Sequence, residues 1–147
     1  MWPSLKPSQR VALAGVINPQ SATTVKATGW VDVSQYENLL AVVNVGSISA
    51  GGTVDAKLRQ AQDNTGTGVK DVAGFAITQL TQAGGNSNEQ AMINLNAASL
   101  DTNNGFTFVE LTITPGTAAA VIAGELWGFD PKIDPPTQPT AVVQTVG

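Results

Sequence analysis

The chain has 147 residues, a formal net charge of −4, and neither cysteine nor histidine. Its length suits one domain. The missing residue types exclude disulfides, thiolate zinc sites and every nucleophile that depends on a histidine base. No basic cluster is present to drive counterion release, so we expect no binding to nucleic acid.

Charged residues make up 12% of the chain, and Gly, Thr, Asn and Gln take their place. Such a surface suits a chain packed against other chains, or a small β-sandwich with an uncharged polar surface. Composition leaves both explanations open. The longest apolar run, residues 118–123, is too short to cross a bilayer, and residues 1–10 lack the apolar segment of a signal peptide. We therefore expect a soluble protein that is made in a cytoplasm and binds no membrane.

The first ten residues predict an extended arm. Pro3 and Pro7 disfavour both a helix and a central strand in this segment. Trp2 and Leu5 are its apolar side chains, and we expect them to contact a neighbouring subunit.

Three β-strands are predicted next. Residues 11–17 form a short apolar run, and the Asn18-Pro19 turn signal is expected to end it. Residues 21–33 are rich in β-branched side chains and predict a half-buried strand that bends at Gly29. Residues 38–45 are almost entirely apolar, which indicates a central strand covered on both faces.

A hairpin follows. Residues 53–62 alternate between apolar and polar side chains, as a strand with one solvated face does. Residues 63–68 carry the glycines of a turn. Residues 69–80 predict the returning strand, with an interruption at Gly74.

The remaining strands follow the same alternation. Residues 90–96 and 106–114 alternate, and residues 97–100 have the composition of a single helical turn. Pro115-Gly116 predicts a turn. Residues 117–129 are expected to complete the core. Within them, residues 117–124 include several alanines, which favour a helix, but this stretch is bounded by Gly116 and Gly124 and is only about two turns long, so we expect a strand.

These spacings predict an all-β fold: a single antiparallel β-sandwich, jelly-roll-like, with about eight strands. The expected divisions are an extended arm at residues 1–10, the sandwich domain at 11–130 and a proline-rich arm at 131–147. Stiff segments lose less entropy on docking, so the apolar side chains of both arms are candidate contacts with other subunits. The candidates for a capsid or subunit interface are Trp2, Leu5, Ile133, Pro135, Pro136, Val142 and Val143.

The stretch DAKLRQAQDNTGTGVKDVAG, residues 55–74, allows three interpretations. A P-loop needs Gly-Lys-Ser/Thr before a helix, but Val69 separates Gly68 from Lys70 and no helix is expected. A calcium loop needs regularly spaced acids, and counted from Asp63 only the first acid and the glycine match. A hairpin needs only a polar turn with glycine, so we expect a hairpin.

Charged side chains on the two strands of this hairpin are then expected to form cross-strand or diagonal pairs near the solvated face. The residues concerned are Asp55, Lys57, Arg59, Lys70 and Asp71. Glu110 lies on the polar face of its strand and is expected to be solvated or at an interface. No pair of acids indicates a glycosidase, and we predict no catalytic residue, no bound metal and no cofactor.

The aromatic residues of the strands have two possible roles. Trp30, Trp127 and Phe129 could form a platform for stacking sugars, or they could pack in the core between the sheets. We expect the second role.

Four runs of sequence resemble a family of small structural proteins of tailed phages and prophages, usually taken to be capsid decoration (cement) or other head-associated proteins. The runs are W-V-D-x-S-x-[YF] at residues 30–36, G-x-T-V-D-A-K-L-x-Q-A-x-D at 51–63, G-x-A-I-T-Q-L-T-x-A-G-G at 74–85 and G-F-x-x-V-x-L-x-[IV]-T-x-G-T-A-A at 105–119. The resemblance covers roughly residues 22–130 and leaves both arms out. Its motifs are structural, so it implies no active site.

The resemblance implies a non-enzymatic virion protein on the outer surface of a phage capsid. Its partners would be the major capsid protein and further copies of itself, in a symmetric oligomer for which we expect a trimer at local threefold positions. Three alternatives stay open: a neck, tail or fibre component, a carbohydrate-binding module, and a hydrolase that uses acids alone.

Overall fold

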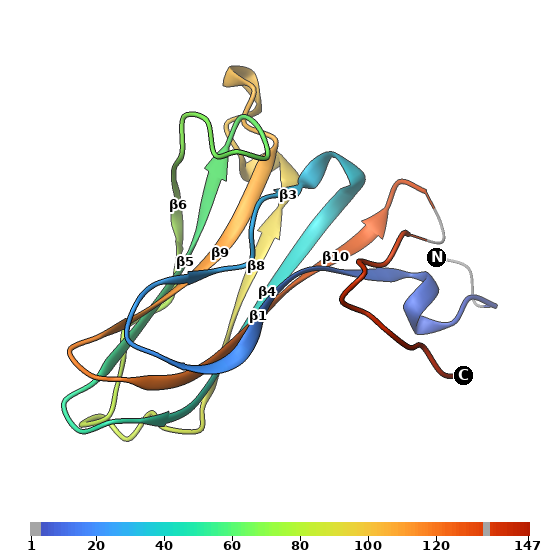
Figure 1. Cartoon of the computed structure of the whole chain (residues 1–147). Helices are drawn as coiled ribbons and strands as arrows, with labels where there is room; N and C mark the ends of the chain where they lie inside the picture. The colour runs from blue at the N-terminus through green and yellow to red at the C-terminus, as the bar shows by residue number, and fades with distance from the viewer. Residues whose placement is uncertain (1–3, 134–135) are drawn as a thin grey trace.

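The computed structural model describes residues 4–133 and 136–147 and is all-β, with two antiparallel sheets packed face to face (Figure 1). This confirms the predicted fold class. Short 3-10 turns lie at η1 (Pro7–Gln9), η2 (Val33–Gln35), η3 (Ala97–Ser99) and η4 (Thr102–Asn104). The strands are β1 (Val11–Ala22), β2 (Lys26–Ala27), β3 (Val31–Asp32), β4 (Tyr36–Ile48), β5 (Thr53–Ala61), β6 (Lys70–Ala76), β7 (Leu80–Thr81), β8 (Gln90–Asn96), β9 (Phe108–Gly116) and β10 (Ala120–Pro131).

The strand order is that of a jelly roll. Sheet A has the order β1-β10-β4-β8, and sheet B has the order β2-β9-β5-β6, with β3 beside β9 and β7 beside β5. The chain therefore crosses between the sheets after β1, β3, β4, β7, β8 and β9, and each sheet collects strands that are far apart in the sequence. Sheet B has six strands because β2 and β3 both pair with β9, and β6 and β7 both pair with β5, so each sheet is four strand positions wide, which is the jelly-roll arrangement.

The core lies between the two sheets and follows from the alternation of side chains. Val109, Leu111 and Ile113 of β9 are fully buried, and so are Leu58 of β5 and Leu126 of β10. Successive side chains of a strand point to opposite faces, so each sheet contributes one apolar set to this layer. The predicted one-turn helix at residues 97–100 is η3, and the segment at 117–129 is a strand as expected.

The first predicted strand boundary is wrong. β1 does not end at the Asn18-Pro19 pair but continues to Ala22, and its pairing with β10 shifts register between Ile17 and Gln20. β1 is an edge strand, and proline is tolerated at edges and bulges, where its missing N–H breaks no ladder hydrogen bond. The pair therefore forms a bulge.

Two further predicted strands are shorter than expected. After the end of β1 at Ala22, the rest of the segment 21–33 contains only the short strands β2 and β3, because Gly29 takes a φ of +81° between them, and Val25 is exposed. The segment 69–80 is divided into β6 and β7. Pro115 and Gly116 belong to β9 instead of a turn, and the chain reverses at Thr117, whose φ is +67°.

The segments before β1 and after β10 lie at the same end of the molecule (Figure 1). The Gln138 side chain joins them: its Nε2 donates to the carbonyl oxygens of Ser8 (2.9 Å) and Val11 (2.7 Å), and its Oε1 accepts from the Leu13 N–H (3.1 Å). Part of the C-terminal segment therefore packs on its own chain. Within the described residues, no helix is long and apolar enough to span a membrane.

Candidate functional site

The stretch 55–74 is a hairpin, as predicted. β5 and β6 are its strands, and the turn is closed by a hydrogen bond from the Gln62 N–H to the Thr67 carbonyl (2.9 Å). The Asp63 carboxylate fills the turn: Oδ1 accepts from the Thr65 N–H (2.9 Å), the Thr65 hydroxyl (2.7 Å) and the Thr67 N–H (3.1 Å). The chain then enters a strand at Lys70, so the turn lacks the helix that a phosphate loop requires.

Charged side chains at the tip of the hairpin form hydrogen bonds and ion pairs within the chain. Hydrogen bonds from Thr67 and Thr65 lower the pKa of Asp63 well below its ordinary value. Lys70 forms an ion pair with Asp101 and lies 4.1 Å from the centre of the Phe106 ring. Hydrogen bonds from Lys70, which has the larger effect, and from Asn104 also lower the pKa of Asp101. Each shift has a structural cause inside the hairpin and its neighbouring loop.

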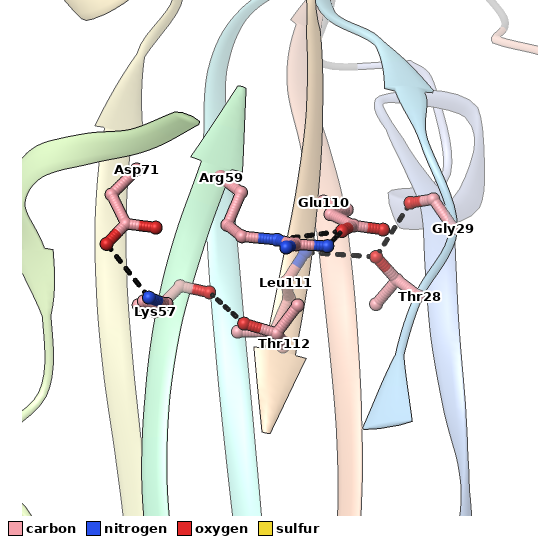
Figure 2. A network of polar contacts seen from close by, with 8 residues as sticks. All are labelled: Thr28, Gly29, Lys57, Arg59, Asp71, Glu110, Leu111 and Thr112. Carbon is pink, nitrogen blue, oxygen red and sulfur yellow. Dashed lines mark hydrogen bonds and ion pairs between the residues drawn. The ribbon is translucent and has the colours of Figure 1, made fainter. Parts of the chain in front are cut away.

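A polar network covers the outer face of sheet B (Figure 2). Lys57 and Asp71 form the expected cross-strand pair, with 2.8 Å between Nζ and Oδ2, and both side chains are well exposed. Arg59 instead pairs with Glu110 of β9, at 3.0 Å between Nε and Oε1. Of the five hairpin charges, only Lys57 and Asp71 pair with each other as expected. Asp55 accepts from Gln79 Nε2 (2.8 Å).

Glu110 was expected to be solvated or at an interface, and the structure shows that it is not solvated. It is 4% exposed, although it lies on the outer face of sheet B. The segment between β2 and β3 brings Trp30 over this face, and its ring centre lies 5.8 Å from Arg59 Cζ. The indole also lies against the hairpin tip, because a Cβ on Gly66 would approach Trp30 Nε1 to 2.9 Å. Glu110 is thus buried against its cation, whose own side chain stays 35% exposed.

The side chains of Trp30, Trp127 and Phe129 do not lie in the core between the sheets, which corrects that prediction. Trp30 lies outside sheet B, as described above. Trp127 and Phe129 are half-buried residues of β10 whose neighbours Leu126 and Gly128 are the buried ones, so their side chains lie outside sheet A. Trp127 Nε1 donates to Glu125 Oε2 at 2.7 Å.

The predicted arm residues fall in different environments. Trp2 and Pro135 lie outside the described residues. Leu5, Pro136 and Val142 are half-buried, and Pro136 lines a hollow of about 150 Å³ together with Gln35 and Tyr36. Ile133 is 72% exposed and Val143 is 93% exposed. The described candidates therefore do not form one continuous site.

The sequence matches no family model and no curated protein. Among solved structures, a chain of the naturally occurring empty particles of Cowpea mosaic virus aligns with a TM-score of 0.41 and 13% identity, over 91% of this chain and 92% of that one. A chain of an empty virus-like particle of the same virus gives 0.35 and 18%, over 76% and 59%. A chain of Broad bean stain virus gives 0.35 and 14%, over 80% and 66%. At these values the likenesses identify neither a family nor a function.

Two exposed apolar features were missed from the sequence. Val146 is 83% exposed in the same segment as Val143. Met92 of β8 is 66% exposed, beside a shallow hollow of about 570 Å³ whose lining includes Leu40, Asn94 and Phe129. The alternation of β8 already places Met92 on the side opposite the buried Ile93, so this signal was present in the sequence.

Proposed function

We propose that this protein is a non-enzymatic structural protein of a bacteriophage virion. In this proposal it is a decoration, or cement, protein that binds the outer surface of the capsid and stabilises contacts between major capsid protein subunits. It acts as a homo-oligomer, with a trimer at local threefold positions as the expected form. The resemblance to phage head-associated proteins supports the class, and the C-terminal segment supports the mechanism.

The observation that carries the proposal is that the C-terminal segment is held at two points and exposes apolar side chains between them. Gln138 makes two hydrogen bonds with β1, at Val11 and Leu13, and one with Ser8 of η1, and the Gly147 carbonyl accepts a hydrogen bond from Lys6 Nζ. Between these points Val143 and Val146 are 93% and 83% exposed. An apolar side chain on a segment with a fixed root loses less entropy when it docks than one on a fully flexible tail.

The runs that carry the resemblance form structural elements. Residues 30–36 form the β3–η2–β4 corner, where Asp32 Oδ1 accepts from the Ser34 N–H (2.9 Å), residues 51–63 contain β5, and residues 105–119 contain β9. We therefore infer that these runs build the sandwich, and that the exposed surface and the terminal segments bind the capsid. Weak contacts of one copy would add up over the many equivalent sites of a capsid.

Copy number tests the proposal. Quantitative mass spectrometry of purified particles that contain this protein should give a copy number comparable to that of the major capsid protein. A neck, tail or fibre component would be present in only a few copies per particle. That result, or the absence of the protein from purified particles, would contradict the decoration role.

Binding provides a second measurement. Purified protein should co-sediment with capsids assembled without it and raise the temperature at which they rupture. Capsids that gain no thermal stability while fully occupied would contradict the stabilising role even if the protein is a virion component.

A further inference from the structure

The edge strands of the two sheets differ in how they are protected from pairing with another chain, and this difference points to an interaction surface. Edge strands present unpaired backbone N–H and C=O groups, which proteins usually protect by covering, charging or breaking the strand. At β1, the edge of sheet A, the Gln138 amide imitates a peptide group: it accepts from the Leu13 N–H and donates to the Val11 carbonyl. The chain itself therefore covers the start of this edge, and further along the edge is broken by Pro19 and the register shift between Ile17 and Gln20.

Both edges of sheet B also carry protection. On one side, β2 and β3 are two residues each and are separated by Gly29 at a φ of +81°. On the other side, β6 begins with the exposed charged residues Lys70 and Asp71, and its pairing with β5 shifts register. Short, charged or irregular strands are poor templates for pairing with another chain.

The last edge, β8, carries no such device within the described residues. Its sequence QAMINLN has no charge, proline or glycine, and it pairs with β4 from Gln90 to Asn96 without a register shift. The Val45 N–H donates to the Glu89 carbonyl, which fixes the parity of the ladder. The backbone groups of Gln90, Met92, Asn94 and Asn96 therefore point away from β4.

These four residues are all exposed, and no hydrogen bond within the described residues reaches their backbone groups. We propose that β8 pairs with β8 of a second copy of the chain, antiparallel, about a twofold axis at Ile93. The proposal deepens the self-association contained in the proposed function and rests on it. It names a dimer interface, which differs from the trimer expected from the resemblance.

The strand is self-complementary in this register. Gln90 lies opposite Asn96 of the second copy, and Met92 lies opposite its Asn94, so each outward N–H and C=O meets its counterpart. The pairing extends over all seven residues of β8, and it joins the two copies of sheet A into one continuous sheet. The thioether of Met92 would lose its exposure against the other strand.

Charge favours a second copy over a charged partner. The chain carries a net charge of −4, so two copies repel each other in general. From Gln90 to Leu100 there is no charged residue, and the pairing places no carboxylate opposite another. Like charges directly opposite each other destabilise strand pairing, and β8 avoids them.

Charge at the edge provides the first test. Sedimentation equilibrium of the full chain should give a concentration-dependent dimer, and Met92→Lys/Asn94→Lys should weaken it about tenfold or more, because each lysine faces a lysine of the other copy. The matched control is Thr114→Lys/Val121→Lys, which adds the same charge at exposed positions of the central strands β9 and β10. A monomeric wild type, or equal weakening by both variants, would overturn the proposal.

Crosslinking tests the register even if the lysine variant is poorly folded. The chain has no cysteine, so introduced thiols are unique. Met92→Cys/Asn94→Cys places thiols opposite each other across the axis and should give a covalent dimer on oxidation. Gln90→Cys/Met92→Cys places each thiol opposite an asparagine and should crosslink much more slowly.

Equal crosslinking of the two cysteine variants, or a trimer that the lysines leave intact, would also overturn the β8 pairing. Neither result depends on capsids. Failure of the proposed function would appear separately, as a chain that dimerises through β8 yet is absent from particles or present in only a few copies.

Discussion

Arg59 and Glu110 are an ion pair with unequal partners. The Arg59 side chain is 35% exposed and the Glu110 side chain is 5% exposed. An arginine at this depth can turn its guanidinium toward water when its partner is lost. A carboxylate at the depth of Glu110 cannot, and a buried charge without a partner is costly.

The two halves of the pair should therefore differ on substitution. We expect Arg59→Met to lower the free energy of unfolding by about 3 kcal/mol, and Glu110→Gln to lower it by only about 1 kcal/mol. Urea denaturation monitored by circular dichroism measures both values. The double variant should be more stable than Arg59→Met alone, because it no longer buries an unpaired charge.

The neighbouring pair on the same face is the control. Lys57 and Asp71 are both well exposed, so Lys57→Met should change the free energy of unfolding by about 0.5 kcal/mol or less. Equal losses for Lys57→Met and Arg59→Met would contradict the role assigned to burial.

Asp63 provides a prediction about pH. Its pKa is lowered in the folded protein by hydrogen bonds from Thr67 and Thr65. Its contribution to stability is therefore present above the unfolded pKa of about 3.9 and is lost as the pH falls toward the lower folded value. The free energy of unfolding should fall less steeply below about pH 4 in Asp63→Asn, which retains an acceptor in the turn but cannot titrate. Identical slopes in the two proteins would contradict this assignment.

At the scale of elements, local alternation was enough to predict the strands that have one face in the core. β5 and β8 are examples, because a period of two is set by the backbone itself. The course of β1 through Pro19 could not be predicted, since its position at an edge depends on strands far away in the sequence. The bend at Gly29 between β2 and β3 was predicted from the local sequence, but the shortness of the two strands was not.

The hairpin can be tested with two glycines of nearly equal φ. Gly66 has a φ of +86° and Gly74 has a φ of +84°, so alanine is strained at both. Only at Gly66 does the new Cβ also meet Trp30, at 2.9 Å, whereas at Gly74 it has open space. We expect Gly74→Ala to cost about 1 kcal/mol and Gly66→Ala clearly more.

Tryptophan fluorescence separates the two effects. Gly66→Ala should shift the emission of Trp30 to longer wavelength by moving the indole into solvent, and Gly74→Ala should leave it unchanged. Because Trp2 and Trp127 also emit, the shift is best measured in a Trp2→Phe/Trp127→Phe background. Equal stability and equal emission of the two alanine variants would show that the indole does not lie on the hairpin tip.

At the scale of the whole molecule, the sequence indicated a sandwich with proline-rich ends but not how the ends pack. The hairpin was predictable because the hydrogen bonds that form its turn, from Gln62 to Thr67 and around Asp63, are local. Burial of Glu110 was not, because the covering indole comes from a different part of the chain. The docking of Gln138 on β1 joins residues 125 to 130 positions apart, and no local pattern reports such a contact.

The C-terminal segment should have separable roles at its root and beyond it. Gln138→Ala removes three hydrogen bonds and should lower the free energy of unfolding by about 2 kcal/mol. Val143→Ser/Val146→Ser should leave stability unchanged and weaken binding to capsids, because both side chains are exposed in the isolated chain. Thermal denaturation and capsid co-sedimentation measure the two effects. Full capsid binding by the valine variant would remove this segment from the interface.

The position of β10 has a consequence for how the protein is made. β10 lies between β1 and β4, and its pairs with them join residues as distant as Val11 and Phe129. The ribosome releases β1 and β4 long before β10. The edge of each strand that pairs with β10 therefore stays unpaired until residue 131 has emerged. Closing such distant pairs is slow, because the entropy of the large loop is lost before any contact compensates for it. Sheet A is therefore completed only after β10 has been synthesised, and a chain cut short before residue 120 would leave two strands open to misassembly.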